Sequence, residues 1–175
     1  MNRLSTLICI ALFSSSVHAA NWSLVNVVQT PATKTDALKL RERNNEVGGA
    51  NMNRFGFYSD LVYDKTSHTW LALSDRGPGG GVLDYATRVQ RIIVQANRSN
   101  AVISEPIIQK TILLKDTNGA LLNGLNPLLL NGDKSNLGAS FDPEGIALGS
   151  NGSMFIADEY GPSVFEFDRK GQMVR

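Results

Sequence analysis

Cysteine and histidine are nearly absent from this chain of 175 residues. The single cysteine, Cys9, lies in the N-terminal hydrophobic segment, and His68 is the only histidine beyond that segment. Once the segment is removed, the chain has no disulfide, thiol nucleophile or cysteine metal site. One histidine is too few for a multi-histidine zinc site and argues against a histidine-based triad. The chemistry of any site is therefore expected to depend on oxygen.

An excess of charge of either sign is also lacking. Lys and Arg number 17 and Asp and Glu number 16. Arg3 belongs to the N-terminal segment, so basic and acidic residues are equal in number once that segment is removed. Because no bulk charge favours a polyanion, we expect neither nucleic acid nor an anionic membrane surface as a partner.

The N-terminal segment predicts export. Residues 1–20 contain Arg3 near the start, an apolar stretch from Leu4 to Val17, and small residues at Ala19 and Ala20. This order is that of a bacterial secretory signal peptide cleaved near Ala19 or Ala20. The apolar stretch is shorter than the roughly 20 residues that span a membrane. We therefore expect residues 21–175 to form the mature domain, secreted or periplasmic and not inserted in a membrane.

Two stretches of the mature chain repeat one pattern. Residues 57–78 and 141–162 align without a gap. The aligned pairs are acidic, apolar or Gly-Pro: Asp60 with Glu144, Val62 with Ile146, Leu71 with Phe155, Asp75 with Glu159, and Gly77-Pro78 with Gly161-Pro162. Internal similarity of this kind is the signature of a repeated supersecondary unit.

Each copy of the repeat predicts a β-hairpin. A short apolar run is followed by a turn rich in Asp, Ser, Asn and Gly, and then by a second apolar run, which is the pattern of two strands around a turn. One acidic residue opens the first strand and another closes the second, where Gly-Pro stops sheet pairing. Since those two places are neighbours in an antiparallel hairpin, we expect an acidic rim on each unit.

Four strands can be counted between one copy and the next. The hairpin is followed by Thr87–Gln95 and Ile107–Leu114, which alternate in polarity around a polar turn. After the second hairpin a third strand is expected at Ser163–Asp168, and a fourth begins at Gln172. Four-stranded antiparallel units in tandem describe a β-propeller. We predict an all-β chain of about two blades, an incomplete ring to which a longer protein would add blades; a small β-sandwich is the alternative.

Two further segments carry weaker signals. Trp22–Val28 alternates well enough to predict a strand after the signal peptide. Lys115–Ser140 is loop-like and long for a connection inside a compact domain. We expect it to cross one face, with a turn of helix around Pro127–Leu130.

Carboxylates gather at the ends of the predicted strands. Such groups repel one another unless a cation lies among them or some are protonated. Hard oxygen ligands in an irregular setting suit calcium. The predicted metal ligands are Asp60, Asp75, Glu144 and Asp158. The predicted catalytic residues are Glu159 and Arg76, whose planar guanidinium suits a phosphate or carboxylate. Tyr160, at the position aligned with Arg76, cannot bind an anion in this way.

The same residues also have structural roles open to them. Asp and Glu before Gly or Pro commonly cap turns by accepting backbone N–H bonds, and this applies above all to Asp142 and Asp158. Arg76 could form an ion pair with Asp75 or Glu159. The glycine run at 77–81 has no Gly-Lys-Ser/Thr ending and no helix after it, so it indicates a sharp turn between strands and not a phosphate loop.

The motifs of residues 53–175 resemble those of the phytase-like family, also described as esterase-like activity of phytase. The resemblance is carried by NRFGFYSDLVYD, WLALSDRGPGGGVLDYATRVQR, FDPEGIA and FIADEYGPSVFEF. It implies an exported bacterial β-propeller, distantly similar to alkaline β-propeller phytases, with calcium-dependent hydrolysis of phosphate esters or other small esters. Members of the family continue into further blades where this chain ends, so remaining blades of a parent protein are expected partners.

Two functions follow from these observations. The first is a metal-dependent hydrolase, with calcium at the acidic rim, Arg76 as anion clamp and a small ester or phosphate ester as substrate. The second is a non-catalytic β-propeller that binds a ligand or partner at the cell envelope, in which the carboxylates only cap turns. The response of activity to a chelator distinguishes the two.

Overall fold

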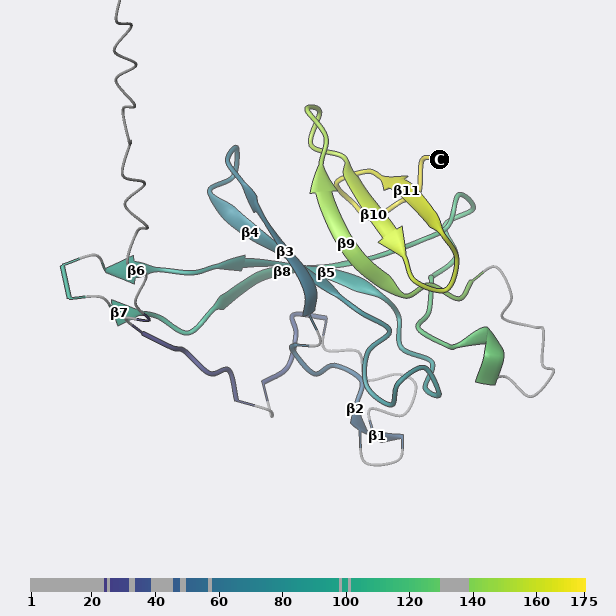
Figure 1. Cartoon of the computed structure of the whole chain (residues 1–175), viewed down its shortest axis with the longest axis horizontal. Coiled ribbons are helices and arrows are strands. Elements are labelled where there is room, and N and C mark those ends of the chain that lie inside the picture. The colour runs from purple at the N-terminus through teal and green to yellow at the C-terminus, as the bar shows by residue number, and fades with distance from the viewer. Residues whose placement is uncertain are drawn as a thin grey trace, which may run out of the picture.

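The described part of the chain is built from antiparallel β-sheets (Figure 1). A computed structural model describes residues 24, 26–31, 34–38, 46–47, 50–56, 58–97, 99–100, 102–129 and 139–175. The prediction of an all-β chain with antiparallel pairing is confirmed for these residues. The predicted signal peptide, residues 1–20, lies outside them.

The first sheet has four strands in the order β3-β4-β5-β8. Their bounds are Tyr58–Asp64, Thr69–Ser74, Arg88–Ile93 and Ile107–Leu113. β4 is central and nearly all of its side chains are buried, whereas β3, at the edge, alternates between exposed and half-buried positions. The apolar run of β4 and the alternation of β3 therefore each match the place of the strand in the sheet.

The hairpin of β5 and β8 is longer than the sequence predicts. The turn expected at Ala96–Asn100 is instead a second strand pair, β6 (Ala96–Asn97) with β7 (Val102–Ile103). The pair extends the hairpin beyond the end of the four-stranded sheet (Figure 1). The polar side chains of this segment concealed the strands from a pattern based on apolar alternation.

The second sheet repeats the start of the first. β9 (Pro143–Leu148), β10 (Met154–Asp158) and β11 (Ser163–Phe167) pair in the order β11-β10-β9. β9 and β10 occupy the positions aligned with β3 and β4, so the repeated hairpin is confirmed. The predicted fourth strand begins as a bridge between Met173 and Phe167.

A shared core joins the two sheets, because β9 lies against β3 and β4 (Figure 1). The buried cluster takes Leu71, Leu73 and Val89 from the first sheet and Ile146 and Phe167 from the second, with other apolar residues of both. Full burial of each such side chain contributes about 1.5 to 3 kcal/mol. The face on which the two sheets meet is therefore the main source of stability in this part of the chain.

The opposite face of the first sheet is covered in part by residues that precede it. Phe55 packs against Ala72 and Ile92, and Asp36 forms a buried ion pair with Arg88. A short ribbon of β1 (Glu46–Val47) and β2 (Ala50–Asn51) lies in this segment. The strand predicted at Trp22–Val28 does not form at its described residues, 24 and 26–28, which pair with no other segment in any sheet.

The connection between the sheets contains one turn of 3-10 helix, η1 (Pro127–Leu129), where a turn of helix is predicted. The described residues form no closed ring of sheets, so the number of blades stays a prediction. Among these residues, no helix has the length and apolar character needed to cross a membrane.

Candidate functional site

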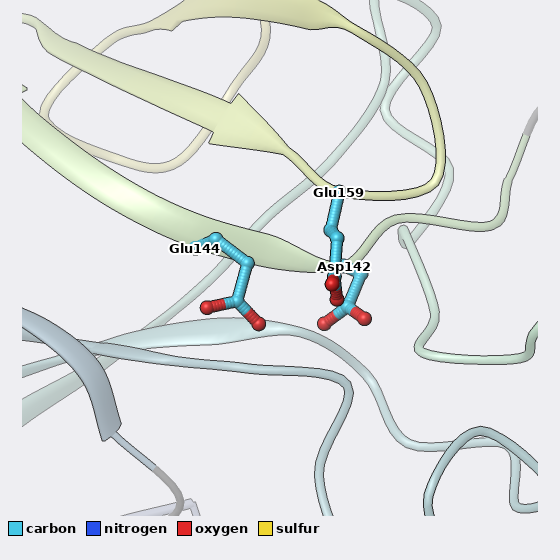
Figure 2. A group of neighbouring side chains, drawn as sticks. All are labelled: Asp142, Glu144 and Glu159. Atoms are coloured by element: carbon cyan, nitrogen blue, oxygen red, sulfur yellow. The ribbon is translucent and has the colours of Figure 1, made fainter.

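Three carboxylates meet where β9 begins and β10 ends (Figure 2). Asp142 precedes β9, Glu144 lies within it, and Glu159 follows β10. One oxygen from each lies within 4.8 Å of the other two. The backbone N–H of Glu159 donates to the carbonyl of Asp142 at 2.9 Å. The expectation that the two ends of a hairpin are neighbours is therefore met in the second sheet.

Arg76 reaches this cluster from the first sheet. Its Nη1 lies 2.7 Å from Oδ2 of Asp142 and 3.6 Å from Oε2 of Glu159. Its backbone N–H also donates to Oδ1 of Asp142, at 3.0 Å. The Asp142 side chain is 0% exposed and that of Arg76 is 34% exposed. A buried carboxylate thus fixes a guanidinium that still faces solvent, through one charge-assisted hydrogen bond and one bond from the Arg76 backbone.

The electrostatics of the cluster favour a further cation. Burial raises the pKa of Asp142 to about 6, against the attraction of Arg76, and the nearby carboxyls of Glu159 and Glu144 add to the rise. Asp142 in turn raises the pKa of Arg76. Three carboxylates therefore share one guanidinium, and the uncompensated negative charge is of the kind that a bound cation relieves.

A pocket of about 330 Å³ opens beside Arg76. It is lined by Arg76, Asn126, Pro127, Leu128, Glu159 and Tyr160. The Tyr160 hydroxyl donates to the carbonyl of Gly124 at 2.8 Å, which fixes the ring as one wall. Glu159, one of the two exposed carboxylates of the cluster, therefore faces a space in which a small molecule can lie.

The glycine run after Arg76 packs beneath this pocket. A Cβ on Gly77 would collide with the Tyr85 ring, and one on Gly81 would lie 2.8 Å from both Asn126 Cβ and the Tyr160 hydroxyl. Gly77 and Gly81 also have positive φ, at 80° and 92°, where only glycine is unstrained. The run is a close-packed turn, as the sequence predicts.

The other predicted ligands are bonded to backbone N–H groups. Asp60 accepts from Ile146 at 2.9 Å and from Leu61 at 2.7 Å. Asp75 accepts from Gly77 at 2.6 Å.

Asp158 accepts from Asp142 at 3.0 Å and from Tyr160 at 3.1 Å. Burial raises the pKa of both Asp75 and Asp158. The structure thus brings Glu144, Glu159 and Arg76 together, while metal binding by Asp60, Asp75 and Asp158 stays a prediction.

Asp142 was not among the predicted ligands. Its position before Pro143 indicated a turn cap, and the residue aligned with it in the first copy is Tyr58. Asp142 could have been found by comparing the charged residues that occur in only one copy of the repeat. The first copy has Arg76 where the second has Tyr160, and the second has Asp142 where the first has Tyr58. The unmatched cation and the unmatched anion pair with one another.

Residues 53–175 match the phytase-like family, described as "Esterase-like activity of phytase". The chain belongs to the phytase-like family. Its segment from β3 to the C-terminus, with both sheets and the cluster, lies within the match.

A curated protein of Arthroderma benhamiae resembles this phytase-like chain. It bears the name "Uncharacterized secreted protein" and is 29% identical over 148 residues. The alignment covers 67% of this chain and 28% of the relative. The chain therefore spans less than a third of the length of that relative. No solved structure matches the chain.

The donor set of the phytase-like chain fits a hard cation. Calcium binds oxygens at about 2.3 to 2.6 Å, so ligands on opposite sides of one ion lie about 5 Å apart. The spacing of 4.8 Å or less within the cluster satisfies that limit. Glu144 and Glu159 are exposed and able to bind an ion, whereas Asp142 is already engaged by Arg76.

Proposed function

We propose that this chain is part of an exported, calcium-dependent hydrolase of phosphate esters or other small esters. The observation that carries the proposal is that Arg76 and Glu159 line one pocket, and that Glu159 belongs to a cluster of three carboxylates. The family description, esterase-like activity of phytase, supports the class of reaction. The name of the relative supports export.

Calcium at Glu144 and Glu159 would polarise the ester and lower the pKa of a bound water. Arg76 binds the anionic group of the substrate, because a third of its side chain is exposed toward the pocket and Asp142 holds it in place. Glu159 lines the pocket and is 58% exposed, so it would hold the ion next to the space that the substrate enters.

The two sheets are proposed to be successive blades of a β-propeller. The support is that β9 and β10 repeat β3 and β4, and that β9 lies against both of them, as neighbouring blades do. The longer relative leaves room for further blades. These blades would be partners of the faces described above and could add residues to the site.

The decisive experiment is an assay of the full-length protein containing this chain, with and without a chelator. Turnover of p-nitrophenyl phosphate or a p-nitrophenyl ester is expected in calcium and should be lost in chelator. Restored activity after calcium is returned separates metal loss from damage. Activity that survives complete chelation would end the calcium proposal.

A second candidate is a non-catalytic propeller that binds a ligand at the cell envelope. The observation in its favour is that Asp60, Asp75 and Asp158 all accept backbone N–H bonds, as capping residues do. It predicts no turnover of any ester, no response of stability to chelator, and a change in binding alone when Arg76 is replaced by alanine.

A further inference from the structure

The pocket beside Arg76 has two unlike walls. One is polar and contains Arg76, Glu159 and Tyr160. The other is apolar and is made by Pro127 and Leu128 of η1. Leu128 is 90% exposed, the highest value among the large apolar side chains described as exposed. An apolar side chain at the mouth of a pocket is available to cover an apolar part of a ligand.

The position of Leu128 is set by local hydrogen bonds. Asn126 Oδ1 accepts the N–H of Leu128 at 2.9 Å, and the Asn126 carbonyl accepts the N–H of Leu129 at 2.9 Å. The N–H of Asn126 in turn donates to the carbonyl of Gly81 at 2.8 Å. The apolar wall is therefore tied to the glycine turn that follows Arg76, so both walls belong to one bonded unit.

The polar wall offers little positive charge. Arg76 is the only cationic side chain among the described residues that line the pocket, and it is already paired with Asp142. Glu159 adds a negative charge to the same wall. A ligand with one anionic group can be bound by Arg76, but further phosphates would meet no cation among these residues and would face Glu159.

The size of the pocket agrees with a small ligand. Its volume of about 330 Å³ lies at the low end of the roughly 300 to 1,000 Å³ of ligand sites. An aromatic ring with one phosphate or carboxylate fits this space.

We infer that the site takes small esters with a single anionic group and an apolar substituent, and not polyphosphorylated compounds, with Leu128 as the residue that recognises the substituent. This inference rests on the proposed function for the chemistry but not for the binding. Arg76 binds the anion and Leu128 covers the apolar group.

The test compares non-hydrolysable ligands on the full-length protein at constant free calcium. Calorimetry with phenylphosphonate and methylphosphonate measures the effect of the apolar group with the anionic group unchanged. We expect phenylphosphonate to bind about tenfold more tightly, a ratio typical of apolar discrimination. Inositol hexakisphosphate should bind more weakly than phenylphosphonate.

The variant Leu128→Ser should bring the phenyl-to-methyl ratio close to one without weakening methylphosphonate. Leu129→Ser is the matched control, because Leu129 belongs to the same turn, is 48% exposed and does not line the pocket. It should keep the ratio of the wild type. Tighter binding of inositol hexakisphosphate, or an unchanged ratio in Leu128→Ser, would overturn the inference.

Turnover separates this inference from the proposed function. Tighter binding of phenylphosphonate than of methylphosphonate, without hydrolysis of any ester, supports the ligand class and contradicts the hydrolase. Hydrolysis of p-nitrophenyl phosphate together with an unchanged phenyl-to-methyl ratio in Leu128→Ser supports the hydrolase and contradicts the ligand class.

Discussion

The backbone N–H and the guanidinium of Arg76 both donate to the one carboxylate of Asp142, at 3.0 and 2.7 Å. The two residues come from different sheets, one following β4 and the other preceding β9. The pair therefore joins the sheets and fixes the only cation that lines the described pocket. Several expected outcomes depend on this pair and its surroundings.

Replacing Asp142 with alanine is expected to destabilise the fold by about 2 kcal/mol. The change leaves the Arg76 backbone N–H and guanidinium without their acceptor, a loss moderated by the exposure of Arg76. Urea denaturation of the full-length protein measures it. Glu105→Gln removes an exposed ion pair with Lys34 and should cost at most about 0.5 kcal/mol. Equal effects for the two variants would show that the Arg76 pair contributes nothing special.

Calcium should raise the melting temperature of the wild type but not of Glu144→Gln. The amide keeps the size of the side chain and removes the charge that a hard cation requires. A calcium titration followed by thermal unfolding gives the affinity, which we expect to fall at least about tenfold in the variant. Glu105→Gln, at a carboxylate far from the cluster in sequence, should bind calcium as the wild type does. Retained affinity in Glu144→Gln would place the cation elsewhere.

Asp75 and Asp64 should respond to pH with opposite signs. Burial chiefly raises the pKa of Asp75, so its contribution to stability is present below pH about 4 and is lost as pH rises through the raised pKa. The hydrogen bond from Ser67 chiefly lowers the pKa of Asp64. Its contribution is present above pH about 4 and is lost as pH falls through the lowered pKa.

The two asparagine variants test this contrast in chelator-treated protein. Asp75→Asn keeps an acceptor for Gly77 and should be at least as stable as the wild type at pH 7, with no gain at pH 3. Asp64→Asn should be less stable at pH 7 and equal to the wild type at low pH. Urea midpoints at several pH values decide it, and a loss of stability in Asp75→Asn that is confined to pH 7 would contradict a raised pKa for Asp75.

Gly81→Ala should weaken both the fold and the pocket. The added methyl group would collide with Asn126 and the Tyr160 hydroxyl, at 2.8 Å from each, and φ there is +92°. We expect a loss of about 2 kcal/mol and weaker binding of phosphate. Gly80→Ala is the matched control, since its φ is +63° and no atom lies within 4 Å of the new Cβ. It should cost about 1 kcal/mol and leave phosphate binding intact; equal binding losses in both variants would refute a role for close packing.

The strands were predictable from sequence because their signals are local. Alternation along Ile107–Leu114 predicts a strand, and the polar turn that Asp64 opens between two apolar runs predicts a hairpin, without knowledge of the rest of the chain. The repeat added the correspondence of β3 with β9. The strand predicted at Trp22–Val28 is absent at residues 24 and 26–28, the described part of that segment, because alternation alone cannot supply a partner strand.

The site was predictable only in part because its contacts join distant segments. Arg76 and Asp142 are 66 residues apart, and Asp60 Oδ2 accepts a hydrogen bond from the N–H of Ile146 in the other sheet. A repeat shows which positions correspond, but not which side chains face across the seam between copies. Leu128 carried no signal at all, since a leucine in a loop is ordinary in composition.

The backbone hydrogen bonds of Lys115 affect how the segments after β8 and β11 unfold. Its N–H donates to the carbonyl of Gly171 at 2.8 Å, and its carbonyl accepts from the N–H of Met173 at 2.9 Å. The segment that follows β8 is therefore hydrogen-bonded to the segment that follows β11. The amide hydrogens of these two segments should therefore exchange with solvent at one common rate, through a single cooperative opening. A protease cut in the connection between β8 and β9 would yield two pieces that stay associated until denaturant is added.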